Sequence, residues 1–269
     1  MRFNSRKEDN INTAKTSDQR SHSRARKGKL SIVGIGPGSQ SLLSINARRA
    51  IKKADIIIGY KRYLDLIKNL INDKESVAFG MREEIKRAKY AIDQAVAGKI
   101  VCIVSSGDPG VYGMAAAVYE ALDQKAVKIT IEVIPGIPAM CSCASLLGAP
   151  ISHDCAIISL SDLLTDKDLI KRRISLAAQG DFVITLYNPK SNKRKEILND
   201  AWKILMQCKS PNTPVGIVRN AYRKNQAIII TTLDNMLNHD TIDMLTTIIV
   251  GNSKTFIKNG VMITPRGYL

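Results

Sequence analysis

Three glycine- or proline-rich breaks, each directly after a short apolar run, most constrain the fold of this chain. They read Ile35-Gly36-Pro37-Gly38, Ser106-Gly107-Asp108-Pro109-Gly110 and Ile134-Pro135-Gly136-Ile137-Pro138. β-Branched residues, which favour strands, are frequent in the runs before them: Leu30–Val33, Ile100–Val104 and Lys128–Val133. In an open α/β sheet, ligands bind outside the carboxyl ends of the strands. The sequence therefore predicts a small-molecule site built by these three loops.

Strand-like and helix-like runs alternate from Leu30 onward, which is typical of an α/β protein. The expected strands are 30–34, 55–58, 100–105, 128–134, 155–160, 182–187, 215–219, 227–231 and 246–250. The expected helices are 42–53, 60–70, 83–96, 111–122, 139–147, 166–177 and 194–207. The last three strands follow one another too closely for helical crossovers, so we expect them to be antiparallel.

Gly148-Ala149-Pro150 interrupts this alternation and is the expected boundary between two domains. Residues 29–148 should form a domain with a mostly parallel sheet, and residues 149–269 a domain with a mixed sheet. Residues 1–28 lack hydrophobic periodicity and are rich in polar and basic residues, so we expect a disordered tail.

The net charge of +16 suggests an anionic partner, such as nucleic acid, an acidic membrane surface or a polycarboxylate substrate. No nucleic-acid-binding motif occurs, and no run of about eighteen apolar residues could span a membrane. We therefore expect neither nucleic acid nor a membrane as the partner. Because the tail also lacks the apolar segment of a secretory signal, we expect a cytoplasmic protein.

Cysteine spacing gives no sign of a metal site or a disulfide framework. Five cysteines are an odd number, and Cys141 and Cys143 form C-x-C rather than the C-x-x-C of common zinc and redox sites. We expect buried, reduced thiols and no metal.

The first loop fails as a nucleotide-binding fingerprint. The third glycine of G-x-G-x-x-G would fall at Ser39, and Pro37 lacks the N–H that a phosphate cradle uses. No G-x-x-x-x-G-K-[ST] occurs either. The glycines are therefore expected to let the backbone approach a ligand closely. The chemistry leaves two roles open for Asp108. It could be a turn residue that caps the following helix, or its carboxylate could hold a polar group of the ligand.

Several long motifs occur in a characteristic order. Residues 105–114 and 133–137 resemble the tetrapyrrole methylases, which use S-adenosylmethionine (SAM) as methyl donor. Residues 148–154, 158–165, 186–191 and 214–220 are similar to the precorrin-3B C17-methyltransferases of cobalamin biosynthesis within that family. The resemblance runs from about Lys29 to the C-terminus and leaves out only the tail.

The resemblance implies a two-domain α/β homodimer with SAM in the cleft between the domains. It also implies methylation of C17 of precorrin-3B, or of its cobalt form, coupled to ring contraction. The residues at the family's SAM-contact positions are Pro37, Ser106, Gly107, Asp108, Val111, Pro138, Ala139, Asn188, Ala221 and Thr246, with Thr247 beside the last. The motifs do not distinguish the metal-free substrate from the cobalt-containing one.

Two departures from the family pattern stand out. Pro138 replaces the usual Thr or Ser, so any SAM contact there must be apolar or through a carbonyl. Asp166-Lys167 replaces the frequent Pro-Trp, so we expect the substrate edge to be built differently there.

The expected reaction needs mainly positioning, because the sulfonium of SAM is already an activated electrophile. We assign no catalytic residue. His153 is an ionisable candidate for the proton movements of ring contraction, but a structural hydrogen bond is the favoured role. The carboxylates of the macrocycle are expected to pair with Arg219, Lys190 and Arg194, with Lys193 a solvated alternative.

Three alternatives remain open at this point. The chain could be a precorrin methyltransferase that acts at another ring carbon. It could be a nucleic-acid-binding protein that uses its basic tail, in which case deletion of residues 1–28 would abolish its salt-dependent affinity. It could also be a SAM-binding regulator without catalysis.

Overall fold

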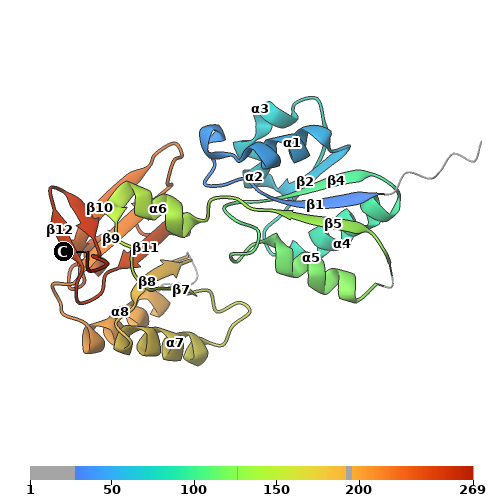
Figure 1. Ribbon diagram of the computed structural model, residues 1–269. Helices are drawn as coiled ribbons and strands as arrows, with labels where there is room; N and C mark the ends of the chain where they lie inside the picture. The colour runs from blue at the N-terminus through green and yellow to red at the C-terminus, as the bar shows by residue number, and fades with distance from the viewer. Residues whose placement is uncertain (1–27, 126, 192–195, 269) are drawn as a thin grey trace, which may run out of the picture.

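Near-continuous apolar runs build a parallel sheet at the centre of the first domain. Side chains of Ile56–Ile58 and of 101–104 are fully buried, as expected for strands that are covered on both faces. The computed structural model describes residues 28–125, 127–191 and 196–268, so the expected tail lies outside the described residues except for Gly28. The described residues form two α/β domains (Figure 1).

The first domain consists, in chain order, of β1 (Lys29–Gly34), η1 (Gln40–Leu42), α1 (Ile45–Lys53), β2 (Ile56–Tyr60), α2 (Lys61–Leu66), α3 (Lys68–Ile71), β3 (Glu75–Phe79), α4 (Glu84–Val96), β4 (Ile100–Ser105), α5 (Met114–Asp123) and β5 (Thr130–Ile134). Its sheet has the strand order β3-β2-β4-β1-β5, and every pairing is parallel. Helices α4 and α5 pack on one face and α1 to α3 on the other. The predicted parallel sheet is confirmed.

The remainder consists of α6 (Ala139–Leu147), β6 (Gly148–Ala149), β7 (Cys155–Ser159), α7 (Lys167–Gln179), β8 (Val183–Tyr187), α8 (Glu196–Cys208), β9 (Pro214–Arg219), β10 (Ala227–Thr232), η2 (Met236–Asn238), β11 (Thr246–Val250), β12 (Phe256–Lys258) and β13 (Val261–Ile263). The order of the larger sheet is β10-β9-β11-β8-β7. Only β7 and β8 are parallel, so the predicted mixed sheet is confirmed.

Helix α6 belongs to the second domain, although it precedes the expected boundary at Gly148. Its buried residues Cys143 and Leu147 pack against Val218 and Ile249 of the second sheet. Figure 1 shows α6 beside β9 and β10. The chain therefore crosses between the domains just after β5.

The sequence analysis missed four strands and misplaced some helix ends. Strand β3 is an edge strand whose side chains are mostly exposed, so it carries no apolar run. Strands β6, β12 and β13 form a small sheet of two- and three-residue strands. The single helix expected at 60–70 is divided at Ile67, whose φ is −116°. The helix expected from Val111 begins only at Met114.

The cysteines are all free, but not all are buried as expected. Cys102 and Cys143 are buried, whereas Cys141 and Cys208 are exposed. Within the described residues, no helix combines the length and the apolar character needed to cross a bilayer.

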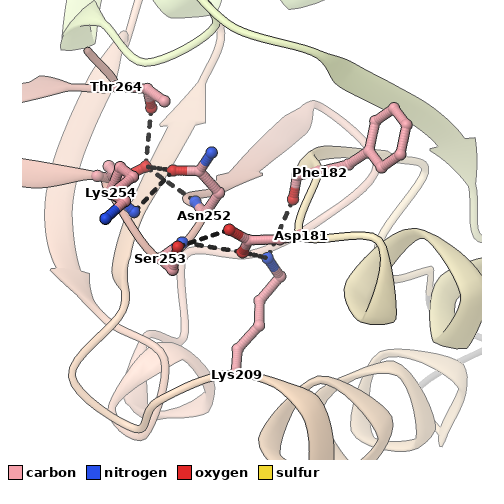
Figure 2. Close-up of polar contacts among 8 residues, drawn as sticks. Asp181, Phe182, Lys209, Asn252, Ser253, Lys254 and Thr264 are labelled. Atoms are coloured by element: carbon pink, nitrogen blue, oxygen red, sulfur yellow. Dashed lines mark hydrogen bonds and ion pairs between the residues drawn. The ribbon is translucent and has the colours of Figure 1, made fainter. Parts of the chain in front are cut away.

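A buried lysine fixes the end of α8 to the rest of the second domain (Figure 2). The side chain of Lys209 is 3% exposed; its Nζ donates to the Phe182 carbonyl at 3.0 Å and lies 3.5 Å from Asp181 Oδ1. Asp181 also accepts hydrogen bonds from the Ser253 backbone N–H at 2.9 Å and the Ser253 hydroxyl at 2.6 Å. One carboxylate thus connects the turn before β8, the end of α8 and the loop after β11.

A nearby series of hydrogen bonds involving hydroxyl groups attaches the end of β13 to this loop. Thr255 Oγ1 lies 2.8 Å from Thr264 Oγ1, which donates to the Pro150 carbonyl at 2.6 Å. Asn252 donates its backbone N–H to Thr255 Oγ1 at 2.8 Å. Buried polar contacts therefore help to hold the C-terminal hairpin, together with the pairing of β13 with β6.

We expect Asp181→Asn to lower the free energy of unfolding by about 2–3 kcal/mol, because Lys209 would remain buried without its counter-charge. The double variant Asp181→Asn/Lys209→Met should recover part of this loss, since an apolar side chain fills the same space without a charge. Urea denaturation of both variants measures the difference. A double variant less stable than Asp181→Asn alone would contradict this account.

The same carboxylate should make stability depend on pH. Burial by itself raises the pKa of Asp181, but the hydrogen bonds from Ser253 and the charge of Lys209 outweigh it and lower the net pKa. The stabilisation is therefore fully present above the pKa of the unfolded carboxyl, about 3.9. It should disappear as the pH falls through the lower pKa of the folded state. Denaturation curves down to that range should show a smaller acid-induced loss for Asp181→Asn than for the parent chain.

Candidate functional site

The three predicted loops meet at one edge of the first sheet. They follow β4, β1 and β5, which are neighbours in that order, so their carboxyl ends lie together. The neighbouring strands β1 and β4 are followed by connections that run in opposite directions across the sheet, from β1 to β2 and from β4 to β5. Such a switch point is where ligands bind in open α/β sheets. Gly36 and Gly107 form a small antiparallel bridge across two of the loops, with N···O distances of 3.1 and 2.8 Å.

The glycines are required because the loops touch each other. A Cβ on Gly136 would lie 2.2 Å from the Gly107 oxygen and 2.8 Å from the Gly34 carbonyl carbon. A Cβ on Gly34 would lie 2.6 Å from the Gly136 nitrogen. The sequence analysis explained the glycines of the first loop, Gly34 among them, by close approach to a ligand. In the structure, Gly34 and Gly136 allow close approach of backbone to backbone, whereas Gly107 adopts a left-handed φ of +65°.

Asp108 connects two of these loops. Its Oδ1 accepts the Gly110 N–H at 2.8 Å, and its Oδ2 accepts the Gly136 N–H at 3.1 Å. It does not cap the following helix, because the N-cap of α5 is Gly113 and no side chain bonds there. The helix-cap interpretation of Asp108 is therefore wrong, whereas its role as a turn residue is confirmed by the hydrogen bond from Gly110. Since a carboxylate offers about four lone-pair positions, two remain for a ligand.

Pro138 is the N-cap residue of α6 and supplies no side-chain acceptor. Its carbonyl accepts the Ser142 backbone N–H at 3.1 Å and the Ser142 hydroxyl at 3.2 Å, so the carbonyl is already engaged. The Tyr187 hydroxyl takes over the capping role and accepts the Met140 N–H at 2.7 Å. Burial raises the pKa of Tyr187 to about 12, although this hydrogen bond opposes the shift. The side chain therefore stays neutral at physiological pH.

A cavity of about 260 Å³ opens beside these loops, between the two domains. All ten residues that the resemblance places at SAM contacts line it: Pro37, Ser106, Gly107, Asp108, Val111, Pro138, Ala139, Asn188, Ala221 and Thr246. They come from the three loops of the first domain and from segments that follow β8 and β9 or begin β11. Among residues 28–125, 127–191 and 196–268, no three His, Cys, Asp or Glu side chains converge as a metal site would require.

The cavity also contains residues that the sequence analysis did not name as site residues. They are Tyr60, Arg62, Tyr63, Met81, Tyr112, Ser142, Cys143, Tyr187, Asn220, Arg223, Met244 and Leu245. Two of them could have been predicted from the sequence, because Tyr60 and Tyr187 each end a strand whose carboxyl end faces the cavity. Arg223 lies in the β9–β10 loop, where residue spacing gives no sign of which side chains turn toward the other domain.

Tyr112 joins the domains at the cavity. Its hydroxyl donates to the Ile157 carbonyl and accepts the Ser159 N–H, both at 3.1 Å. Both partners belong to β7, the edge strand of the second sheet. The ring of Tyr112 lies 5.5 Å from that of Tyr187. A backbone φ of +51°, rare for tyrosine, accompanies these contacts.

The expected substrate-binding and ionisable residues that the structure describes, Arg219, Lys190 and His153, lie outside the cavity lining. Arg219 is ion-paired with Asp243, whose Oδ2 lies 2.9 Å from both Nε and Nη2. Lys190 is partly buried but does not line the cavity, and Arg194 lies outside the described residues, as does Lys193. His153 lines a different hollow of about 500 Å³ near the C-terminus, away from the three loops.

We expect Gly136→Ala to destabilise the first domain by about 3 kcal/mol or more, because its methyl group would overlap the backbone of two other loops. Gly110→Ala is a matched control: its Cβ would meet only the Asp108 side chain, at 3.1 Å, and should cost less than about 1 kcal/mol. Thermal denaturation compares the two. Equal melting temperatures would show that the loops can separate freely.

We expect Tyr187→Phe to cost about 1 kcal/mol, since the Met140 N–H loses its acceptor. Pro138→Thr should raise stability more in the Tyr187→Phe background than in the parent chain, because only there does the new hydroxyl cap an unpaired N–H. Urea denaturation of the four proteins gives this coupling. Additive effects would contradict a shared capping role.

Comparison with known proteins places the chain in a family. The model of the family described as Tetrapyrrole (Corrin/Porphyrin) Methylases matches residues 29–237. The chain is similar to the cobalt-factor III methyltransferase of Priestia megaterium, with 53% identity over 246 residues. That match covers 90% of this chain but only 45% of the relative, so the chain spans less than half of that protein.

Two further relatives match over nearly their full length. A probable cobalt-factor III C(17)-methyltransferase of Salmonella typhimurium is 46% identical, and the match covers 89% of this chain and 99% of that protein. The crystal structure of the methyltransferase CobJ superimposes with a TM-score of 0.82 at 33% identity and covers 88% of this chain and 100% of that one. The chain therefore belongs to the tetrapyrrole (corrin/porphyrin) methylases.

Proposed function

We propose that this chain transfers a methyl group from SAM to C17 of a tetrapyrrole in cobalamin biosynthesis, with contraction of the macrocycle. The substrate is cobalt-factor III or its metal-free counterpart, precorrin-3B. The single observation that carries this proposal is the cavity, which gathers all ten expected SAM-contact residues between the domains. The names of the similar proteins from Priestia and Salmonella support the cobalt-containing form, and the name of the Salmonella protein also supports C17.

The size of the cavity indicates that only one of the two ligands can be enclosed in it. About 260 Å³ is slightly less than a typical small-molecule pocket of about 300–1,000 Å³, so it cannot enclose a methyl donor and a macrocycle together. We therefore assign the enclosed part to SAM and place the macrocycle over the open side. Met81, which is well exposed, and Tyr60 offer apolar surface there.

Positioning is the main task of the protein. SAM supplies an activated methyl group, and an electron-rich carbon of the macrocycle attacks it without a strong general base. The chain must orient the two ligands and exclude water. The joined loops of the first domain and the Tyr112 contact to β7 are suited to this, because they hold both walls of the cavity in a fixed relation.

The hydrogen bonds within the site limit what each residue can offer SAM. The carbonyl of Pro138 is engaged by Ser142, so we assign Pro138 an apolar contact. The Asn188 amide donates to the Ser159 hydroxyl at 2.9 Å, which leaves its carbonyl oxygen for the ligand. The Thr246 hydroxyl donates to Asp243 Oδ1 and accepts the Asp243 N–H, both at 3.1 Å, so its one remaining lone pair or its backbone would make the contact.

The roles of Arg219, Lys190 and Arg194 toward the carboxylates of the macrocycle remain proposals. A substrate carboxylate would have to compete with Asp243 for Arg219. The expected homodimer and the cytoplasmic location also remain predictions. Light scattering of the purified protein would test the former.

The experiment incubates the purified chain with SAM carrying a deuterated methyl group and with each tetrapyrrole in turn, under anaerobic conditions. We expect a product that is heavier by one labelled methyl group, with that group at C17 by NMR and with an altered absorbance spectrum. A chain lacking residues 1–28 serves as control and should retain activity, because the tail lies outside the family match. Methylation at another carbon would favour a different precorrin methyltransferase, and no methylation of either substrate would overturn the proposal.

A further inference from the structure

Arg223 places a guanidinium on the wall of the cavity and reaches from the second domain to the first. Its Nε donates to the Pro37 carbonyl, and its Nη2 donates to the Ser106 hydroxyl at 2.8 Å. Both acceptors are neutral groups. A guanidinium has five N–H groups, so three of them have no acceptor among the residues that the structure describes.

No described carboxylate neutralises this charge. Asp108 is the only acidic residue in the cavity lining, and it forms hydrogen bonds with Gly110 and Gly136. Burial lowers the pKa of Arg223, and the groups that oppose this shift are Tyr63 and Cys143. Burial raises the pKa of both of these side chains, so neither carries a charge at neutral pH. A partly buried cation without a counter-ion is costly and calls for an anionic ligand.

The loop that carries Arg223 is built to hold it in place. Asn220, Tyr222 and Asn225 have φ values of +53°, +58° and +60°, and this left-handed conformation is strained for tyrosine. The Tyr222 N–H donates to Gln226 Oε1 at 2.7 Å, and the Tyr222 hydroxyl lies 2.8 Å from Ser145 Oγ. These contacts offset the strain and restrict the positions that the guanidinium can adopt.

We propose that Arg223 binds a ligand carboxylate in the cavity between the domains. Within the proposed function, on which this inference rests, two carboxylates are available: that of the amino-acid part of the methyl donor, and an acetate or propionate of the tetrapyrrole. The planar guanidinium fork matches either one in a bidentate pair. Its present partners, Pro37 and Ser106, are themselves expected SAM contacts, so the guanidinium lies next to the methyl-donor part of the cavity.

The test compares Arg223→Gln with the parent chain by calorimetric titration of three ligands. These are S-adenosylhomocysteine, 5′-methylthioadenosine, which lacks the amino-acid carboxylate, and cobalt-factor III. If Arg223 pairs with the donor, affinity for S-adenosylhomocysteine should fall at least about 30-fold while that for 5′-methylthioadenosine changes less than about threefold. If it pairs with the macrocycle, affinity for cobalt-factor III alone should fall by a similar factor. Equal weakening of all three, or no change in any, would overturn the proposal.

Control variants separate the carboxylate role from a loss of structure. Arg173→Gln makes the same charge change on an exposed position of α7 and should leave all three affinities unchanged. Arg223→Lys keeps the charge but loses the fork, so it should recover only part of the lost affinity. If the parent chain binds S-adenosylhomocysteine but methylates neither tetrapyrrole, the proposed function fails, whereas the affinity ratio still decides the role of Arg223.

Discussion

The contact among the backbones of Gly34, Gly107 and Gly136 is the constraint on which the rest of the site depends. The three strands that lead into it are neighbours, and the backbones converge so closely that a Cβ would not fit at Gly34 or at Gly136. Ala139, the first residue of α6, follows Gly136 by only three positions. The point where the chain leaves the first domain is therefore fixed by the same contact that shapes the cavity.

This packing also explains why an acidic residue lies among the glycines. Buried or half-buried N–H groups need acceptors, and loops made of Gly and Pro have few side chains to supply them. Asp108 accepts from Gly110 within its own loop and from Gly136 in the next one. The observed role of Asp108 is therefore structural, since it connects two loops. The sequence analysis considered a helix cap and a ligand contact for this residue, but not a bridge between loops.

What the sequence could predict depended on how local the signal was. Strands β1, β4 and β5 contain runs of β-branched residues, and the loops after them are rich in Gly and Pro. Local composition was therefore enough to predict these strands and loops. The cavity residues were reached through ordered motifs of a known family. Strand β3 lacks such a run because it lies at the sheet edge with its side chains exposed. Helix α6 precedes the expected boundary but packs on the second sheet, because its small apolar residues fit either domain and only long-range packing decides between them.

Pro138 and Tyr187 illustrate a dependence that no single segment reveals. Proline at the N-cap removes an acceptor, and the missing acceptor is supplied by a hydroxyl 49 residues later in the chain. Arg223 is a similar case, since its acceptors lie in two loops of the other domain. The net charge of +16 drew attention to basic residues in general, but most of the Lys and Arg side chains in the described part of the chain are exposed, where interactions are weak and screened. A single guanidinium in a partly buried cavity, with neutral neighbours, exerts a stronger field on a ligand than many exposed ones. The charge that matters for recognition is therefore decided by burial and partners, which composition does not report.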